Sequence, residues 1–169
     1  MTTFNNQDLQ SKFDENGYIA INPLFSIDKI EEIKIELSRY IKDVSPNVPD
    51  HHIFYENKDD KTTIKQLQQM FTYDDYFKKL IENSPIREVA EIVLREKAQP
   101  KNLQFFNKPP GIGKPTPPHQ DGYYFMLKKH NAVTCWLARE KVDEENGCIH
   151  YVKGSHKLEY RPHGKSNVL

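Results

Sequence analysis

Pro117-Pro118-His119-Gln120-Asp121-Gly122 leads into an aromatic run, Tyr123-Tyr124-Phe125. On an extended strand, side chains two positions apart point to the same face of the sheet. We therefore expect the imidazole of His119 and the carboxylate of Asp121 to converge on one point. Such a pair supplies two corners of the 2-His-1-carboxylate facial triad, which binds Fe(II) and leaves other positions open. The same residues also fit a simpler interpretation, a surface histidine beside a turn-forming aspartate.

The composition predicts a single domain over residues 1–169 with a core of its own. Lys+Arg 24 and Asp+Glu 24 cancel, so no overall field favours a nucleic acid or an acidic membrane surface. No apolar run reaches the length of a membrane span, and the first residues lack the features of a signal peptide. We expect a small-molecule substrate, with neither a nucleic acid nor a membrane as partner; the oligomeric state stays open.

The two cysteines, Cys135 and Cys148, lie in apolar segments and form no C-x-x-C pattern. This placement favours buried free thiols in a reducing compartment. We therefore expect the protein to be cytoplasmic.

The first hundred residues predict a layer of helices. The clearest helix is capped by Ser26, has apolar residues at positions 27, 30, 33, 37, 40 and 41, and ends at Pro46. Ser84-Pro85 is a good start for another helix, over 84–96. Shorter helices are expected over 6–15, ended by Gly17, and over 65–70 and 73–81. Brief strands are expected over 18–21 and, as a strand or extended loop, over 52–55.

The remaining residues have a different character. Short aromatic or β-branched runs at 103–107, 122–127, 133–138 and 148–152 are separated by turn residues. Strands of this length and spacing are typical of an antiparallel sandwich or jelly roll. The sequence thus predicts an α+β protein in which a helical layer backs a β core.

Four short motifs follow one another in this second part: His-Gln-Asp at 119–121, Trp-Leu-Ala at 136–138, Glu-Asn-Gly-Cys at 145–148 and Gly-Ser-His at 154–156. The ordered set resembles the phytanoyl-CoA dioxygenase family of Fe(II)/2-oxoglutarate-dependent oxygenases, and especially its domain-containing proteins. The resemblance extends from about residue 10 to the end and is strongest over 103–163. It implies a double-stranded β-helix, the cupin-like jelly roll, with iron at one open end.

The same resemblance implies the site residues. His119 and Asp121 match the first two iron ligands of the family. Lys65, Gln104 and Trp136 fall where related proteins contact 2-oxoglutarate: a cation for a carboxylate, an amide donor, and an apolar wall with one N–H. Without the family, these three would be read as a solvated lysine, a strand-face glutamine and a core tryptophan.

The other histidines carry weaker expectations. His156 is expected to have a turn or packing role, His150 to lie in a strand, and His163 to be a substrate-side contact. The rest are expected to be exposed loop residues: His51, His52 and His130.

The family's third iron ligand, a histidine, and the arginine that pairs with 2-oxoglutarate lie downstream of the Gly-Ser-His turn. The printed sequence stops at Leu169 before either, and also before enough strands exist to close the sandwich. We therefore expect an incomplete piece of a larger domain that is inactive or nearly so by itself; a complete chain that has lost catalysis is the alternative.

The resemblance implies a dioxygenase that hydroxylates a small organic substrate, converts 2-oxoglutarate to succinate and CO2, and uses Fe(II), with ascorbate as a further candidate. Two other functions fit the residues less well. One is a non-catalytic jelly-roll binding module, and the other is a metal-dependent isomerase or lyase of the cupin type, against which Asp121 and Trp136 speak.

Overall fold

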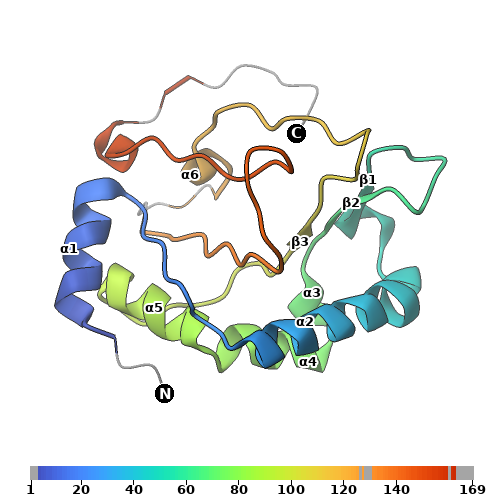
Figure 1. Ribbon diagram of the computed structural model, residues 1–169, viewed down its shortest axis with the longest axis horizontal. Helices are drawn as coiled ribbons and strands as arrows, with labels where there is room; N and C mark the ends of the chain where they lie inside the picture. Colours follow the sequence, from blue (N-terminus) through green and yellow to red (C-terminus); the bar gives the residue numbers. More distant parts are fainter. Residues whose placement is uncertain (1–3, 126, 128–130, 160, 163–169) are drawn as a thin grey trace.

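The computed structural model describes residues 4–125, 127, 131–159 and 161–162. These residues form a mixture of helices and strands with one small, open sheet. The helices are α1 (Asn6–Asn16), α2 (Ile27–Arg39), α3 (Met70–Tyr73), α4 (Asp75–Glu82), α5 (Pro85–Leu94) and α6 (Asp121–Phe125). The strands are β1 (Ile53–Tyr55), β2 (Ile64–Leu67) and β3 (Phe105–Phe106). Helices α1, α5, α4 and α2 line one side of the molecule, and long irregular segments after β3 cover the other (Figure 1).

Helix α2 forms as its apolar spacing predicts. The Ser26 hydroxyl accepts a hydrogen bond from the Lys29 backbone N–H, which caps the first turn. Ile33 and Leu37 are buried, whereas Ile35 on the other face is 67% exposed. The helix continues into a π-helical turn, Tyr40–Val44, and a 3-10 turn, Ser45–Asn47, that contains the expected terminator Pro46.

The main core lies where α2 meets β2, α3 and α4. Tyr40, at the end of α2, is fully buried, and its ring meets that of Phe77 edge-on, with centroids 5.4 Å apart. Burial and the nearby charge of Asp74 raise the pKa of Tyr40 to about 12, so its hydroxyl stays neutral. The buried members of this cluster are Ile33, Leu37, Tyr40, Val48, Leu67, Met70, Phe77 and Leu80.

An ion pair joins α2 to the start of α4. The Arg39 guanidinium donates to Asp74 at 2.7 Å and to Glu36 at 2.6 Å. The other carboxylate oxygen of Asp74 accepts from the backbone N–H groups of Tyr76 and Phe77 and so caps α4. One carboxylate therefore fixes both the start of α4 and its orientation relative to α2.

The sheet is antiparallel in the order β1-β2-β3. Leu67 pairs with Ile53 on one side and Phe105 on the other, and the register between β1 and β2 shifts between Phe54 and Tyr55. The expected helix over 65–70 is thus wrong, and only Met70 belongs to a helix. Strand partners on both sides outweigh a weak local helical preference.

Most of the strands predicted from short apolar runs are absent from the described residues. Only Phe105–Phe106 of the run 103–107 forms a strand, and the runs 18–21, 133–138 and 148–152 form no strand ladder. The run 122–127 is also not a strand, because Asp121–Phe125 is helical; residue 126 lies outside the described residues. A short apolar run becomes a strand only when a neighbour completes its hydrogen bonds.

Helix α5 has the predicted start, with the Ser84 hydroxyl accepting from the Ile86 N–H and Pro85 as first residue. It ends at Leu94, two residues earlier than expected. Arg95 follows in the left-handed region with φ of 59° and pairs with Asp14 of α1 at 2.5 Å. Among the described residues, no helix has both the length and the apolar character needed to cross a bilayer.

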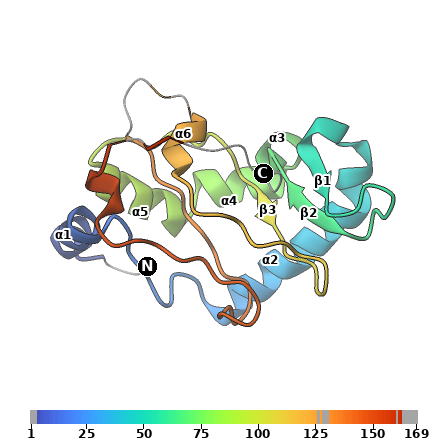
Figure 2. The same ribbon diagram turned by 90° about the horizontal axis from the view of Figure 1, so that it is seen from above.

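The turn over 151–156 is fastened to the end of α1, and we call this contact the clasp. The Gly154 N–H donates to the Asn16 carbonyl at 2.7 Å, and Lys153 pairs with Glu15 at 2.7 Å. Nearby, the rings of Tyr18 and Tyr151 stack with centroids 5.4 Å apart. Figures 1 and 2 both show this turn beside α1.

His156 completes the clasp, with its Nε2 3.1 Å from the Asp14 carbonyl. The turn and packing role predicted for this histidine is confirmed. Gly17, which ends α1 with φ of 81°, lies so close that a Cβ there would come within 2.3 Å of the His156 ring.

Burial on α2 can be tested with two substitutions two residues apart. We expect Leu37→Ala to lower the free energy of unfolding by about 2–5 kcal/mol, because it leaves a cavity in the core. Ile35→Ala, on the exposed face, should change it by no more than about 0.5 kcal/mol. Urea unfolding followed by circular dichroism measures both, and equal effects would contradict the assigned core face.

The contact between Gly17 and His156 can be tested against a second glycine. Gly111 also has positive φ, 78°, but a Cβ there would meet nothing within 4 Å. We expect Gly111→Ala to cost about 1–2 kcal/mol from backbone strain alone. Gly17→Ala should cost clearly more in thermal or urea unfolding, and the excess should shrink in a His156→Ala background. Equal costs at both glycines would rule out the contact.

Candidate metal centre

His119 and Asp121 lie together at the start of α6. Nε2 of His119 is 3.1 Å from Oδ1 of Asp121, so the two side chains converge as expected. The local structure differs from the expectation, because Asp121 is the first residue of a helix instead of part of a strand. Pro117 and Pro118 cannot donate backbone hydrogen bonds to a strand ladder, and an aspartate is favourable in the first turn of a helix.

Each of the two side chains is held by a second contact. Nδ1 of His119 lies 2.8 Å from the Pro117 carbonyl, which can only accept, so Nδ1 carries the proton. Oδ2 of Asp121 accepts from the Thr134 hydroxyl at 2.7 Å. The atoms left facing each other are Nε2 and Oδ1. Sequence reasoning did not single out Thr134, since a lone threonine two residues before Trp136 carries no recognisable signal.

Gln120, between the two, points elsewhere and binds a later segment. Its Oε1 accepts from the Arg161 N–H at 2.9 Å, and its Nε2 donates to the Glu159 carbonyl at 3.5 Å. The segment that carries His119 and Asp121 is thereby joined to Glu159 and Arg161. His163, expected as a substrate-side contact, lies outside the described residues, as does His130.

Aromatic side chains flank the pair on the α6 side. The Tyr124 ring meets the His119 ring edge-on at 6.0 Å, and Tyr123 packs edge-on against Tyr124 at 5.3 Å. Tyr123, Tyr124 and Phe125 are all exposed, so none of them packs in the core.

Tyr151 lies close enough to Asp121 to be affected by its charge. Partial burial of its hydroxyl, reinforced by the charges of Asp121 and Cys135, raises the pKa of Tyr151. The phenol therefore remains protonated near neutral pH. It offers a neutral donor near the carboxylate, where a second anion would be unfavourable.

Lys65 and Gln104 lie on the sheet instead of at α6. Lys65 Nζ is 3.9 Å from the carboxylate of Glu56, a side chain with only 7% exposed surface. The Gln104 amide oxygen accepts from Gln66 at 2.8 Å and Asn102 at 3.1 Å. The sheet and α6 occupy separate places in both views (Figures 1 and 2), so the described contacts do not join these two residues to His119. Their contact with 2-oxoglutarate stays a prediction.

Trp136 lies on the same segment as Thr134 and is 48% exposed. The simple reading of a core tryptophan does not fit this exposure. Its neighbour Leu137 packs on the core instead, and Arg139 lies over the Phe105 ring, 4.9 Å from its centroid. These contacts anchor the segment and leave the indole accessible.

The other histidines that the structure describes form no metal cluster with the pair. His52 is half-buried, with Nδ1 2.8 Å from the Tyr73 hydroxyl, so its expected place in an exposed loop is wrong. Nε2 of His150 is 3.4 Å from Cys148 Sγ, outside any strand. Within the described part of the chain, no three His, Cys, Asp or Glu side chains gather in a way that could hold a metal.

Both cysteines are free thiols, as expected, but neither is fully buried. Cys148 is half-buried and Cys135 is exposed as a whole residue. Enough protein still surrounds the Cys135 thiol that desolvation raises its pKa.

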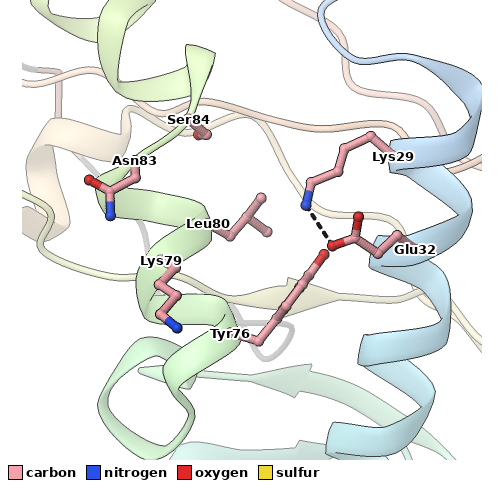
Figure 3. A pocket seen from close by; sticks show the side chains of 7 residues that line it. All are labelled: Lys29, Glu32, Tyr76, Lys79, Leu80, Asn83 and Ser84. Atoms are coloured by element: carbon pink, nitrogen blue, oxygen red, sulfur yellow. Dashed lines mark hydrogen bonds and ion pairs between the residues drawn. The ribbon is translucent and has the colours of Figure 1, made fainter.

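A pocket of about 370 Å³ lies between α2 and α4, away from the pair (Figure 3). Within it, Lys29 and Glu32 already form an ion pair at 2.6 Å, and this contact raises the pKa of Lys29. The lining includes none of the predicted site residues; it consists of Lys29, Glu32, Tyr76, Lys79, Leu80, Asn83 and Ser84.

Comparison with known proteins shows the family to which the chain belongs. The chain is 29% identical over 164 residues to the phytanoyl-CoA dioxygenase, peroxisomal, of Mus musculus, covering 91% of this chain and 48% of that protein. It is 30% identical over 164 residues to the Bos taurus protein of the same description, covering 91% and 49%. The phytanoyl-CoA dioxygenase domain-containing protein 1 homolog of Caenorhabditis briggsae is 24% identical over 188 residues, covering 89% and 65%.

The chain thus spans about half the length of the curated mammalian relatives that it matches. No solved structure matches it significantly. A sequence model of the family described as Phytanoyl-CoA dioxygenase (PhyH) matches residues 13–166, which include His119, Asp121 and the clasp. The resemblance seen in the four motifs is therefore confirmed, and this chain belongs to the phytanoyl-CoA dioxygenase family.

Proposed function

We propose that the protein is an Fe(II)- and 2-oxoglutarate-dependent dioxygenase that hydroxylates a small organic substrate and releases succinate and CO2. The observation that carries the proposal is the 3.1 Å approach of His119 Nε2 to Asp121 Oδ1. Family membership supports the class of reaction. The jelly-roll fold and a cytoplasmic location are parts of the same proposal.

The pair has the chemistry of a cation site. With its proton on Nδ1, neutral His119 presents a lone pair at Nε2, and ionised Asp121 presents only acceptor lone pairs. Two such atoms 3.1 Å apart repel unless a cation, either a second proton or a metal ion, lies between them. Ligand atoms about 2.1 Å from a metal and at right angles to each other are themselves about 3.0 Å apart, close to the observed separation.

His119 and Asp121 would therefore hold Fe(II) as adjacent ligands. Bound iron, together with 2-oxoglutarate and oxygen, supplies the oxidising power for hydroxylation. The chain's own contribution is orientation: the Pro117 carbonyl fixes the histidine tautomer, and Tyr124 restricts the ring.

Of the three residues proposed for 2-oxoglutarate, Trp136 is the one that the described contacts link to the metal pair. It lies two residues from Thr134, which binds Asp121 directly. Lys65 would have to exchange Glu56 for a carboxylate of 2-oxoglutarate, and Gln104 would contribute its amide. The aromatic side chains of α6 provide an exposed apolar surface suited to a partly apolar substrate.

Metal binding tests the proposal first. We expect the chain to bind Mn(II), a stable substitute for Fe(II), in a titration followed by water proton relaxation. His119→Ala and Asp121→Asn should abolish the saturable signal, because each removes a ligand. His150→Ala, at an exposed histidine beside Cys148, should leave it unchanged. Saturable binding that survives both ligand substitutions would refute the metal site.

The co-substrate gives a second test. 2-Oxoglutarate should alter the Mn(II) signal of the wild-type chain, and the effect should weaken in Trp136→Ala. Succinate formation by this 169-residue chain with Fe(II) and ascorbate should stay near background, since its described residues offer two protein ligands instead of three. Robust turnover would overturn that last expectation, and failure of 2-oxoglutarate to affect the metal signal would favour a non-catalytic binding module.

A further inference from the structure

The two oxygens of the Asp121 carboxylate lie in different surroundings. Oδ1 faces the imidazole of His119, whereas Oδ2 is bound by the hydroxyl of Thr134 at 2.7 Å. A carboxylate can only accept, so the threonine hydroxyl donates its single hydrogen to Oδ2. A contact of this length to an ionised oxygen is a strong, charge-assisted hydrogen bond.

We infer that Thr134 is a positioning residue that orients Asp121 to present Oδ1, and only Oδ1, to a divalent metal ion. The inference rests on the proposed function, in which Asp121 is a metal ligand. An aspartate with both oxygens accessible can rotate or bind a metal through both of them. Occupation of Oδ2 by a hydroxyl removes the second option and leaves one oxygen beside Nε2 of His119.

The need for such a partner follows from the exposure of the carboxylate. The Asp121 side chain keeps 48% of its surface accessible, so burial alone does not fix its rotamer. Thr134 comes from a segment 13 residues later, and that segment is itself anchored through Leu137 and Arg139. The hydrogen bond from Thr134 thereby ties Asp121, at the start of a five-residue helix, to this anchored segment.

In both proposed ligands, a hydrogen-bond partner occupies the polar atom that does not face the other ligand. The Pro117 carbonyl binds Nδ1 of His119 and leaves Nε2 available, while Thr134 binds Oδ2 of Asp121 and leaves Oδ1 available. Partners that bind the outer atom of a metal ligand commonly contribute 10–100-fold to metal affinity. Thr134 would complete this arrangement on the carboxylate side.

The test compares Mn(II) affinity, by water proton relaxation, in wild type, Thr134→Val and Thr134→Ser. Valine keeps the shape and removes the hydroxyl, so we expect affinity to fall by about 10–100-fold. Serine keeps the hydroxyl donor, so Thr134→Ser should retain most of the wild-type affinity for Mn(II). The matched control is Thr62→Val, which removes a similar 2.7 Å bond from Thr62 to Asp60 in a turn remote from the pair, and should leave affinity unchanged.

The outcomes separate the inference from the function on which it rests. If Asp121→Asn abolishes binding while Thr134→Val binds as tightly as wild type, the positioning role is wrong and the metal site stands. If the wild-type chain binds no metal, both are wrong. Thermal unfolding without metal excludes a merely structural effect: an affinity loss that serine does not recover, matched by a loss of stability, would also overturn the inference.

Discussion

The burial of one face of α2 is the constraint on which the rest of this structure depends. Ile33, Leu37 and Tyr40 can leave water only if β2, α3 and α4 close over them, and this packing places the first half of the chain. The Arg39–Asp74 pair then fixes the angle between α2 and α4. The segments that carry His119, Asp121 and Trp136 follow this core in the sequence, and Phe105 and Leu137 are among the residues that pack them against it.

The candidate site is accordingly held by a few hydrogen bonds and not by a sheet. His119 and Asp121 are positioned by a carbonyl two residues away and by a hydroxyl 13 residues away, without a surrounding sheet. In this structure the two ligands converge on a helix start, although sequence spacing alone suggested a strand. His119 lies before α6, so its approach to Asp121 depends on the contacts of the two side chains with the Pro117 carbonyl and the Thr134 hydroxyl, which the spacing of two residues does not reveal.

Sequence reasoning succeeded where local signals decide the outcome. Ser26 and Ser84 cap helices that start where they were expected, and Gly17 ends α1 in the left-handed conformation. It failed where partners distant in sequence decide. Ile64–Leu67 became a strand because β1 and β3 lie on either side of it, and the run 133–138 found no strand partner among the described residues. Thr134 acts through a contact with Asp121, 13 residues earlier in the sequence, and the type of residue alone does not predict this contact.

The clasp makes the stability of α1 depend on the turn over 151–156. Helix α1 buries no residue completely, so by itself it would fray in water. Contacts with Arg95, and with Gly154 and His156 of the clasp, stabilise it. Amide protons of α1 and of the turn over 151–156 should therefore exchange with solvent as one cooperative unit, opening together and well before the core around Tyr40.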